Sequence, residues 1–180
     1  MRVIAGSAKG TRLAPVPTGT RPLSDRAREG LFSSLGSEVE GARCADLYAG
    51  TGAVGIEALS RGAESCLFVD GSGPAIRTIR DNLVRTGFED RSRVVRASTG
   101  RALEREREPL DVAFLDPPYD APAEDLRRVL SQVTVLISPR GALVLTRAKR
   151  DSTDVVPVHW PVDRLLTYGD ARILICREAT

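Results

Sequence analysis

The sequence has little of several residue types that functional sites often use, and it has no long apolar segment. Its 180 residues include one histidine and three cysteines, with no Cys-x-x-Cys pair. Zinc and iron–sulfur centres need clusters of such ligands, so we expect no metal site and three reduced thiols. No apolar run approaches the roughly 18 residues that span a bilayer, and no signal peptide is evident. We therefore expect a cytoplasmic protein with no membrane contact.

The sequence also lacks a large excess of either charge, because its formal net charge is only +2. A composition of 42% hydrophobic and 28% charged residues is typical of a globular protein, and the length suits one domain. The cations are unevenly spread: residues 1–30 contain six cations against two acids, and lysine occurs only at Lys9 and Lys149. An arginine-rich N-terminus suits phosphate recognition, although genomic base composition could equally produce it.

The first 22 residues read as a basic hairpin and loop that precede the main domain. Two short extended stretches, 2–5 and 11–14, flank a glycine-bounded turn, and a proline-punctuated loop continues to Pro22. Ser24 can then cap a helix whose apolar face includes Leu31 and Leu35. We accordingly divide the chain into residues 1–22 and a domain over residues 23–180.

From Arg43 onward, short apolar stretches alternate with helical patterns. Strands are predicted at 44–48, 66–69, 94–97, 111–115, 142–146, 164–168 and 172–176, with helices between most of them. Such alternation requires right-handed crossovers and a parallel sheet covered on both faces. The Gly169-Asp170 link is too short for a crossover, so the last two strands should form a hairpin. The sequence predicts an α/β, Rossmann-like fold with a mostly parallel seven-stranded sheet, in which one strand is antiparallel.

A glycine loop indicates a nucleotide-type cofactor. Residues 50–55 fit G-x-G-x-x-G between a predicted strand and helix, and Asp70 follows at the distance typical of a ribose-binding acid. A nicotinamide dinucleotide and S-adenosylmethionine both fit this pattern. Asp46, four residues before the loop, could hold the ammonium of a methionine, whereas a pyrophosphate would gain nothing from a nearby negative charge. With a single histidine and few lysines for proton transfer, S-adenosylmethionine is the favoured cofactor.

The tetrapeptide Asp116-Pro117-Pro118-Tyr119 is the most informative catalytic signal. Two prolines cannot continue a strand ladder, so the chain should extend stiffly beyond the carboxyl edge of the sheet, where ligands bind. The Asp116 carboxylate and the Pro117 carbonyl can accept both hydrogens of an exocyclic amine, which favours a pyramidal, nucleophilic nitrogen. Tyr119 can stack on the same base.

These motifs together resemble those of the bacterial 16S ribosomal RNA guanine-N2 methyltransferase family called RsmD. The likeness extends over nearly the whole chain and includes the sequences at 1–6, 21–29, 46–52, 57–63, 116–119 and 168–170. It implies a class I methyltransferase fold and methylation of one guanine amine in 16S rRNA, within an assembled or assembling 30S subunit. Two positions depart from the family pattern. Asp70 stands where relatives usually have Glu, and Ser98 stands where an acid or amide commonly meets the adenine.

The pattern and the resemblance give three sets of candidate residues. The catalytic candidates are Asp116, Pro117, Pro118 and Tyr119. The cofactor-binding candidates are Asp46, Tyr48, Gly50, Thr51, Gly52, Asp70, Ser98, Thr99 and Asp116. The RNA-binding candidates are Arg2, Lys9, Arg12, Arg21, Arg26 and Arg28, although an arginine on a capped helix is more often simply solvated.

Other functions remain open at this point. A DNA adenine-N6 methyltransferase would use the same tetrapeptide but usually needs an added recognition domain, and a release-factor glutamine methylase usually has Asn at position 116. A non-catalytic RNA-binding assembly factor with this fold is a third alternative. Trp160 and His159 could stack on RNA, but an aromatic residue covering the core is the more common arrangement. We expect a monomer.

Overall fold

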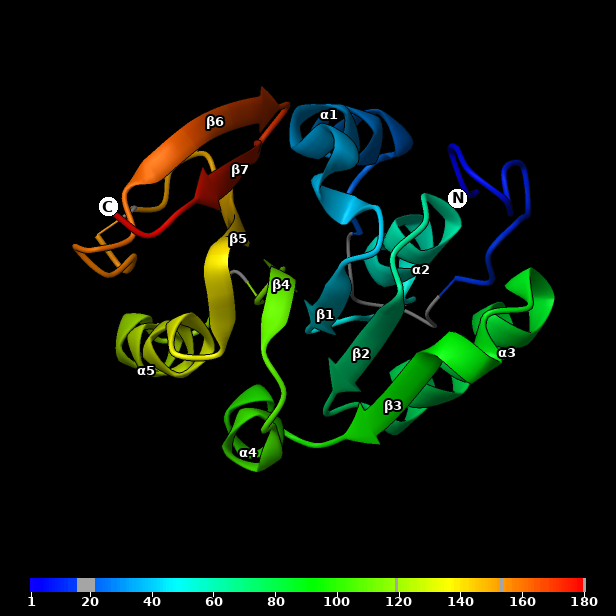
Figure 1. The fold of residues 1–180 in the computed structure, drawn as a ribbon. Helices are drawn as coiled ribbons and strands as arrows, with labels where there is room; N and C mark the ends of the chain where they lie inside the picture. The colour runs from blue at the N-terminus through cyan, green and yellow to red at the C-terminus, as the bar shows by residue number, and fades with distance from the viewer. Residues whose placement is uncertain (16–21, 119, 153, 180) are drawn as a thin grey trace.

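A single seven-stranded sheet forms the centre of the protein in the computed structural model, which describes residues 1–15, 22–118, 120–152 and 154–179 (Figure 1). The strands are β1 (Arg43–Leu47), β2 (Ser65–Asp70), β3 (Ser92–Arg96), β4 (Leu110–Leu115), β5 (Ile137–Ala148), β6 (Val162–Tyr168) and β7 (Ala171–Cys176). The α-helices are α1 (Asp25–Leu35), α2 (Ala53–Ser60), α3 (Gly73–Thr86), α4 (Thr99–Arg105) and α5 (Ala123–Thr134). Two short 3₁₀ helices lie at Gly36–Val39 and Glu89–Arg91.

The strand order is β3-β2-β1-β4-β5-β7-β6, and β7 runs antiparallel to both of its neighbours. The strands from β3 to β5 pair in parallel, which places their carboxyl ends at one edge of the sheet. The link between β6 and β7 consists only of Gly169 and Asp170, so the predicted hairpin and the predicted α/β fold class are confirmed. Strand β5 is longer than predicted because it also pairs with β4 at Ile137, before a bulge.

Helices cover both faces of the sheet and enclose two hydrophobic cores (Figure 1). Helices α1, α2 and α3 bury residues such as Phe32, Ile56 and Ile79 on one face. Helices α4 and α5 bury Leu103 and Leu130 on the other face. Trp160 belongs to this second core and is 2% exposed, so it covers the core and does not face a ligand. The three cysteines are free and buried, as the sequence predicted.

The predicted N-terminal hairpin is present only as a single antiparallel bridge between Arg2 and Arg12. The Val3 N–H donates to Thr11 O at 3.0 Å, and the Gly10 N–H donates to Val3 O at 2.9 Å. The pairing ends there because the chain turns: Thr11 N–H donates to Ala8 O within the turn, and the Ala5 N–H donates to the Glu57 carboxylate on α2. Residues 1–15 thus form an irregular strap across the helices rather than a regular two-stranded unit.

Candidate active site

A cavity of about 980 Å³ opens at the carboxyl edge of the sheet, where β1, β2 and β4 end. Ligands of α/β proteins with parallel sheets bind at this edge. The predicted residues that line the cavity are Asp46, Tyr48, Gly50, Thr51, Asp70, Ser98, Thr99, Asp116, Pro117 and Pro118. Gly52 adjoins it as the N-cap of α2. The fold therefore brings the glycine loop and the Asp-Pro-Pro motif to one cavity.

The loop between β1 and α2 needs glycine for conformation and for packing. Gly50 and Gly52 have φ angles of 57° and 76°, in the left-handed region that side chains other than glycine rarely adopt. Gly55 is needed for a different reason, because a Cβ there would lie 2.4 Å from Phe68 Cε1 on β2. Each glycine of the motif thus keeps the chain close to β1 and β2, and the first turn of α2 faces the cavity.

Asp70, at the end of β2, holds the glycine loop through its carboxylate. Its Oδ2 accepts the Gly50 N–H at 2.9 Å, and its Oδ1 accepts the Ser72 N–H at 2.8 Å. Each oxygen keeps a second lone pair, and the side chain lines the cavity. The sequence predicted a ribose-binding acid here, and the structure adds a role in fixing the loop that approaches the ligand.

Asp46 lies almost completely buried on β1, beneath the glycine loop. Its Oδ2 accepts the Gly55 N–H at 2.9 Å. Burial raises the pKa of this carboxyl to about 8, and the hydrogen bond from Gly55 opposes the rise while the charges of Asp116 and Asp70 add to it. A cationic group in the cavity would therefore favour the ionised form of Asp46.

Asp116 follows β4 directly, and its backbone N–H donates to Leu47 O, which keeps it beside the end of β1. Burial raises the pKa of the Asp116 carboxyl to about 7. Pro117 is buried and Pro118 is exposed, and the Pro118 carbonyl accepts the Ala121 N–H at 3.0 Å. Tyr119, the fourth residue of the motif, lies outside the described residues.

The far side of the cavity lies where β3 leads into α4. Ser98 is the N-cap residue of α4, but its side chain makes no capping hydrogen bond, and Thr99 is buried. Burial raises the pKa of Tyr48, while a hydrogen bond to Thr99 opposes this. The cavity continues between α4 and α5 to Arg101 and Arg128, which sequence reasoning did not identify because both read as solvated helix positions.

The six predicted RNA-binding residues do not share one environment. Arg2, Lys9, Arg12 and Arg26 are exposed, and Arg21 lies outside the described residues. The prediction that Arg28 binds RNA at the surface is wrong, because its side chain is completely buried. On α1 it faces α2, where its Nη1 lies 3.6 Å from Glu57 Oε2.

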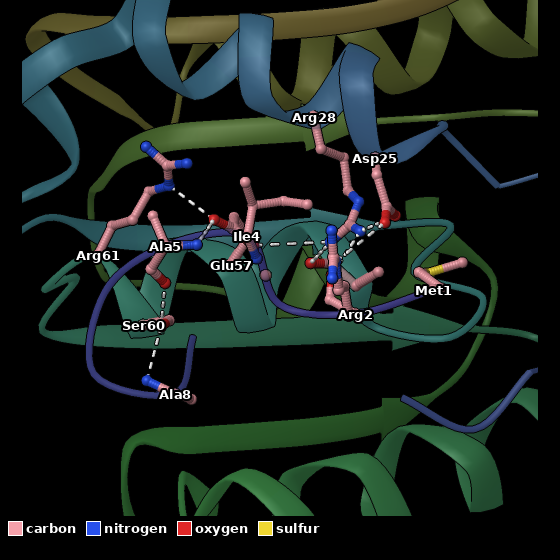
Figure 2. A network of polar contacts seen from close by, with 12 residues as sticks. Met1, Arg2, Ile4, Ala5, Ala8, Asp25, Arg28, Glu57, Ser60 and Arg61 are labelled. Carbon is pink, nitrogen blue, oxygen red and sulfur yellow. Dashed lines mark hydrogen bonds and ion pairs between the residues drawn. The ribbon is translucent and has the colours of Figure 1, made fainter. Parts of the chain in front are cut away.

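Figure 2 shows the polar network that attaches the N-terminal strap to the helices. Glu57, on α2 and 0% exposed, accepts the backbone N–H groups of Ile4 and Ala5 and pairs with Arg28 and Arg61. Ser60, one turn later on the same helix, donates to Ala5 O and accepts the Ala8 N–H. Sequence reasoning missed these roles, and the only signal was an acid and a hydroxyl within an otherwise apolar helix.

A second buried connection joins the strap to the glycine loop. Asn82, on α3, accepts the Ala14 N–H at 2.7 Å and donates through Nδ2 to Thr51 O at 3.0 Å and to Ala14 O at 3.2 Å. Its side chain therefore fixes the strap and the loop in one position relative to α3.

Within residues 1–15, 22–118, 120–152 and 154–179, no group of three or more His, Cys, Asp or Glu side chains is arranged to hold a metal ion. No helix in this described part of the chain has the length and apolar character to cross a membrane.

Comparisons with known proteins agree on one kind of relative. Residues 1–177 match the model of the family described as Conserved hypothetical protein 95. Ribosomal RNA small subunit methyltransferase D of Escherichia coli K12 is 33% identical over 189 aligned positions, covering 99% of this chain and 91% of the relative. The same enzyme of Haemophilus influenzae is 28% identical over 94% of this chain and 89% of the relative.

Solved structures show the same likeness over full length. The candidate methyltransferase yhhF of Escherichia coli superposes with a TM-score of 0.87 at 29% identity, covering 100% of this chain and 99% of that one. The hypothetical protein TTHA0928 of Thermus thermophilus superposes with a TM-score of 0.80 at 30% identity, covering 98% and 99% of the two chains. The fold is thus the one seen in class I methyltransferases.

Proposed function

The chain belongs to the family described as Conserved hypothetical protein 95, and we propose that it methylates the exocyclic N2 amine of a guanine in 16S ribosomal RNA, with S-adenosylmethionine as methyl donor. One observation carries the proposal: the Asp116-Pro117-Pro118 motif lines the same cavity as the glycine loop. The name of the Escherichia coli relative, a methyltransferase of small-subunit ribosomal RNA, supports the substrate class.

The cavity residues fit S-adenosylmethionine in both charge and shape. Gly50 and Gly52 permit close approach to the backbone, and Asp70 offers carboxylate lone pairs to a ribose. Asp46 offers a buried acceptor to a cation, which a methionine ammonium would satisfy. The volume of about 980 Å³ leaves room for a base beside the cofactor, since small-molecule sites occupy about 300–1,000 Å³.

The amine of guanine is a poor nucleophile because its lone pair is delocalised into the ring. When bound, S-adenosylmethionine supplies an electrophilic methyl group on a sulfonium sulfur. In the proposed reaction, the Asp116 carboxylate and the Pro117 carbonyl accept the two amine hydrogens and hold the nitrogen pyramidal, with its lone pair free. Tyr119 is proposed to stack on the base. These residues orient the amine and exclude water, which supplies much of the acceleration without a metal.

The ionised form of Asp116 is the better acceptor for an amine hydrogen. Because burial raises its pKa to about 7, a substantial fraction of the protein carries the carboxylate at neutral pH. The nitrogen loses a proton after methyl transfer, and Asp116 is the nearest acceptor that we assign to receive it.

The RNA target must reach the cavity as an unstacked base. Turning a base out of a helix costs a few kcal/mol, and less in a loop. We propose that the exposed cations Arg2, Lys9, Arg12 and Arg26, with Arg21, bind the RNA backbone, within the 30S subunit or an assembly intermediate.

A methyl-transfer assay with alternative substrates tests this proposal. The protein is incubated with tritiated S-adenosylmethionine and with unmethylated 30S subunits, naked 16S rRNA or DNA, and the labelled base is mapped. Label on a guanine of 16S rRNA is expected. Label on DNA adenine, or no label on any of the three substrates, would reject the proposal.

The variants of Asp116 provide the matched comparison. Asp116→Ala should abolish transfer, while Asp116→Asn should retain some because its amide oxygen still accepts one hydrogen. Asp81→Asn, which removes an exposed carboxylate on α3, should transfer at the wild-type rate. Equal activity of Asp116→Ala and wild type would exclude the assigned role.

A further inference from the structure

Arg28 is a completely buried arginine that lines the cavity. Its Nη2 donates to Arg2 O at 2.7 Å and to Asp25 Oδ1 at 2.6 Å. Its Nη1 has only long contacts, 3.5 Å to Ala53 O and 3.6 Å to Glu57 Oε2. Nε has no hydrogen-bond partner in the described part of the chain. Since buried polar groups are nearly always paired, this guanidinium has unused donor capacity.

The ion-pair network around Arg28 also has an excess of positive charge. Three arginines, Arg2, Arg28 and Arg61, share the two carboxylates of Asp25 and Glu57. Figure 2 shows these side chains converging between α1, α2 and the N-terminal strap. A buried cation costs free energy unless an anion neutralises it, and Glu57 is already shared with Arg61. Arg28 therefore shares each of its two carboxylates with another arginine.

Arg28 and Asp46 both contact the first turn of helix α2. Arg28 reaches the carbonyl of Ala53, the first residue of α2, and Asp46 accepts the N–H of Gly55, two residues later. Both side chains line the cavity. This turn therefore has a buried cation and a buried carboxyl beside it, which is the pair of groups that a free amino-acid moiety needs for its carboxylate and its ammonium.

We infer that Arg28 is a cofactor-binding residue whose guanidinium faces the carboxylate of the methionine moiety of S-adenosylmethionine, opposite the ammonium at Asp46. This inference rests on the proposed function, since it takes S-adenosylmethionine as the ligand. RNA phosphate does not fit the position, because the side chain is 0% exposed and lies in the wall of the cavity.

Ligands with and without the amino-acid moiety separate this role from structural support. S-adenosylhomocysteine has the moiety, and 5′-methylthioadenosine lacks it but keeps the adenosine and the thioether. Isothermal titration calorimetry of Arg28→Gln should show about 10- to 100-fold weaker binding of S-adenosylhomocysteine, the range expected for loss of a charge-assisted hydrogen bond. Binding of 5′-methylthioadenosine should change by no more than about twofold, because it makes no contact there.

Arg61→Gln is the matched control, because Arg61 pairs with the same Glu57 but does not line the cavity. It should bind both ligands as the wild type does. Arg28→Lys keeps the charge and should recover part of the lost affinity. Equal weakening of both ligands by Arg28→Gln would assign Arg28 to structural support alone and overturn the inference.

A binding measurement on the wild-type protein tests the inference even if the Arg28 variants fail to fold. The analogue of S-adenosylhomocysteine that lacks only the carboxylate should bind about 10- to 100-fold more weakly than the parent. Equal binding of the two compounds would overturn the inference while the proposed function stands. If neither S-adenosylhomocysteine nor 5′-methylthioadenosine bound, both the inference and the proposed function would be rejected.

Discussion

At the scale of single residues, the environment of Asp116 predicts how activity depends on pH. Burial raises the pKa of its carboxyl to about 7, and the proposed mechanism uses the ionised form to accept one amine hydrogen while the Pro117 carbonyl accepts the other. The kcat/KM for methyl transfer should therefore rise with pH through a midpoint near 7. The profile is measured from about pH 5.5 to about pH 9 for the wild type and Asp116→Asn. The residual activity of Asp116→Asn should lack that midpoint, and a wild-type profile that is flat across the range would refute the assignment.

Asp46 predicts how stability depends on pH. Burial raises its pKa to about 8, so the folded protein binds a proton at this site that the unfolded chain releases near its usual pKa of about 4. Stability from this group is complete below the unfolded pKa and is lost as the pH rises through the folded pKa. The thermal unfolding midpoint of the wild type should decrease as the pH rises from about 5 to about 8, and that of Asp46→Asn should decrease less. A wild-type midpoint that rises over this interval by an amount that Asp46→Asn abolishes would contradict the account.

At the scale of elements, Glu57 attaches the N-terminal strap to α2 and forms an ion pair with the buried Arg28. Removing one partner of a buried ion pair costs about 3–5 kcal/mol, because the other charge stays buried. We expect Glu57→Gln to lower the free energy of unfolding by that order, measured by denaturant titration. Glu64→Gln, an exposed acid after the same helix, should change it by less than about 0.5 kcal/mol. Equal stability of Glu57→Gln and wild type would show that the network contributes little.

Features that depend on residues close in sequence could be predicted, whereas features that depend on contacts between distant segments could not. The antiparallel β7 followed from the short Gly169-Asp170 link, and the α1 cap followed from Ser24, which accepts the Ala27 N–H. Burial of Arg28 could not be predicted, since its partner Glu57 lies on another helix and an arginine on a helix normally reads as solvated. The N-terminal hairpin is reduced to a single bridge, and Glu57, on a distant helix, accepts the Ala5 N–H that a longer ladder would use.

At the scale of the whole molecule, the parallel sheet explains why the sequence predicts candidate residues that line one cavity. Parallel strands bring their carboxyl ends to one edge, so Asp46, Asp70 and Asp116, each at or near a strand end, converge there. The extension of the cavity between α4 and α5 was not predictable, because it depends on how these two helices pack.

The exposed cations of the N-terminal region predict salt-dependent RNA binding. Affinity for 16S rRNA should fall steeply with salt, and Arg12→Ala or Arg26→Ala should each reduce the slope of log affinity against log salt by about 1. Fluorescence anisotropy at several salt concentrations measures this slope. Arg127→Ala, an exposed arginine on α5 across the sheet, is the control and should leave the slope unchanged. Identical slopes for Arg12→Ala, Arg26→Ala and the wild type would remove these residues from the RNA interface.

The central claim is that the acidic motif after β4 and the glycine loop after β1 form one site that methylates guanine. Mass spectrometry of nucleosides, from 16S rRNA treated with the protein and S-adenosylmethionine, tests it most directly. The wild-type reaction should yield N2-methylguanosine, and the Asp116→Ala reaction should yield none. A different methylated nucleoside, or N2-methylguanosine at equal yield from both proteins, would contradict it.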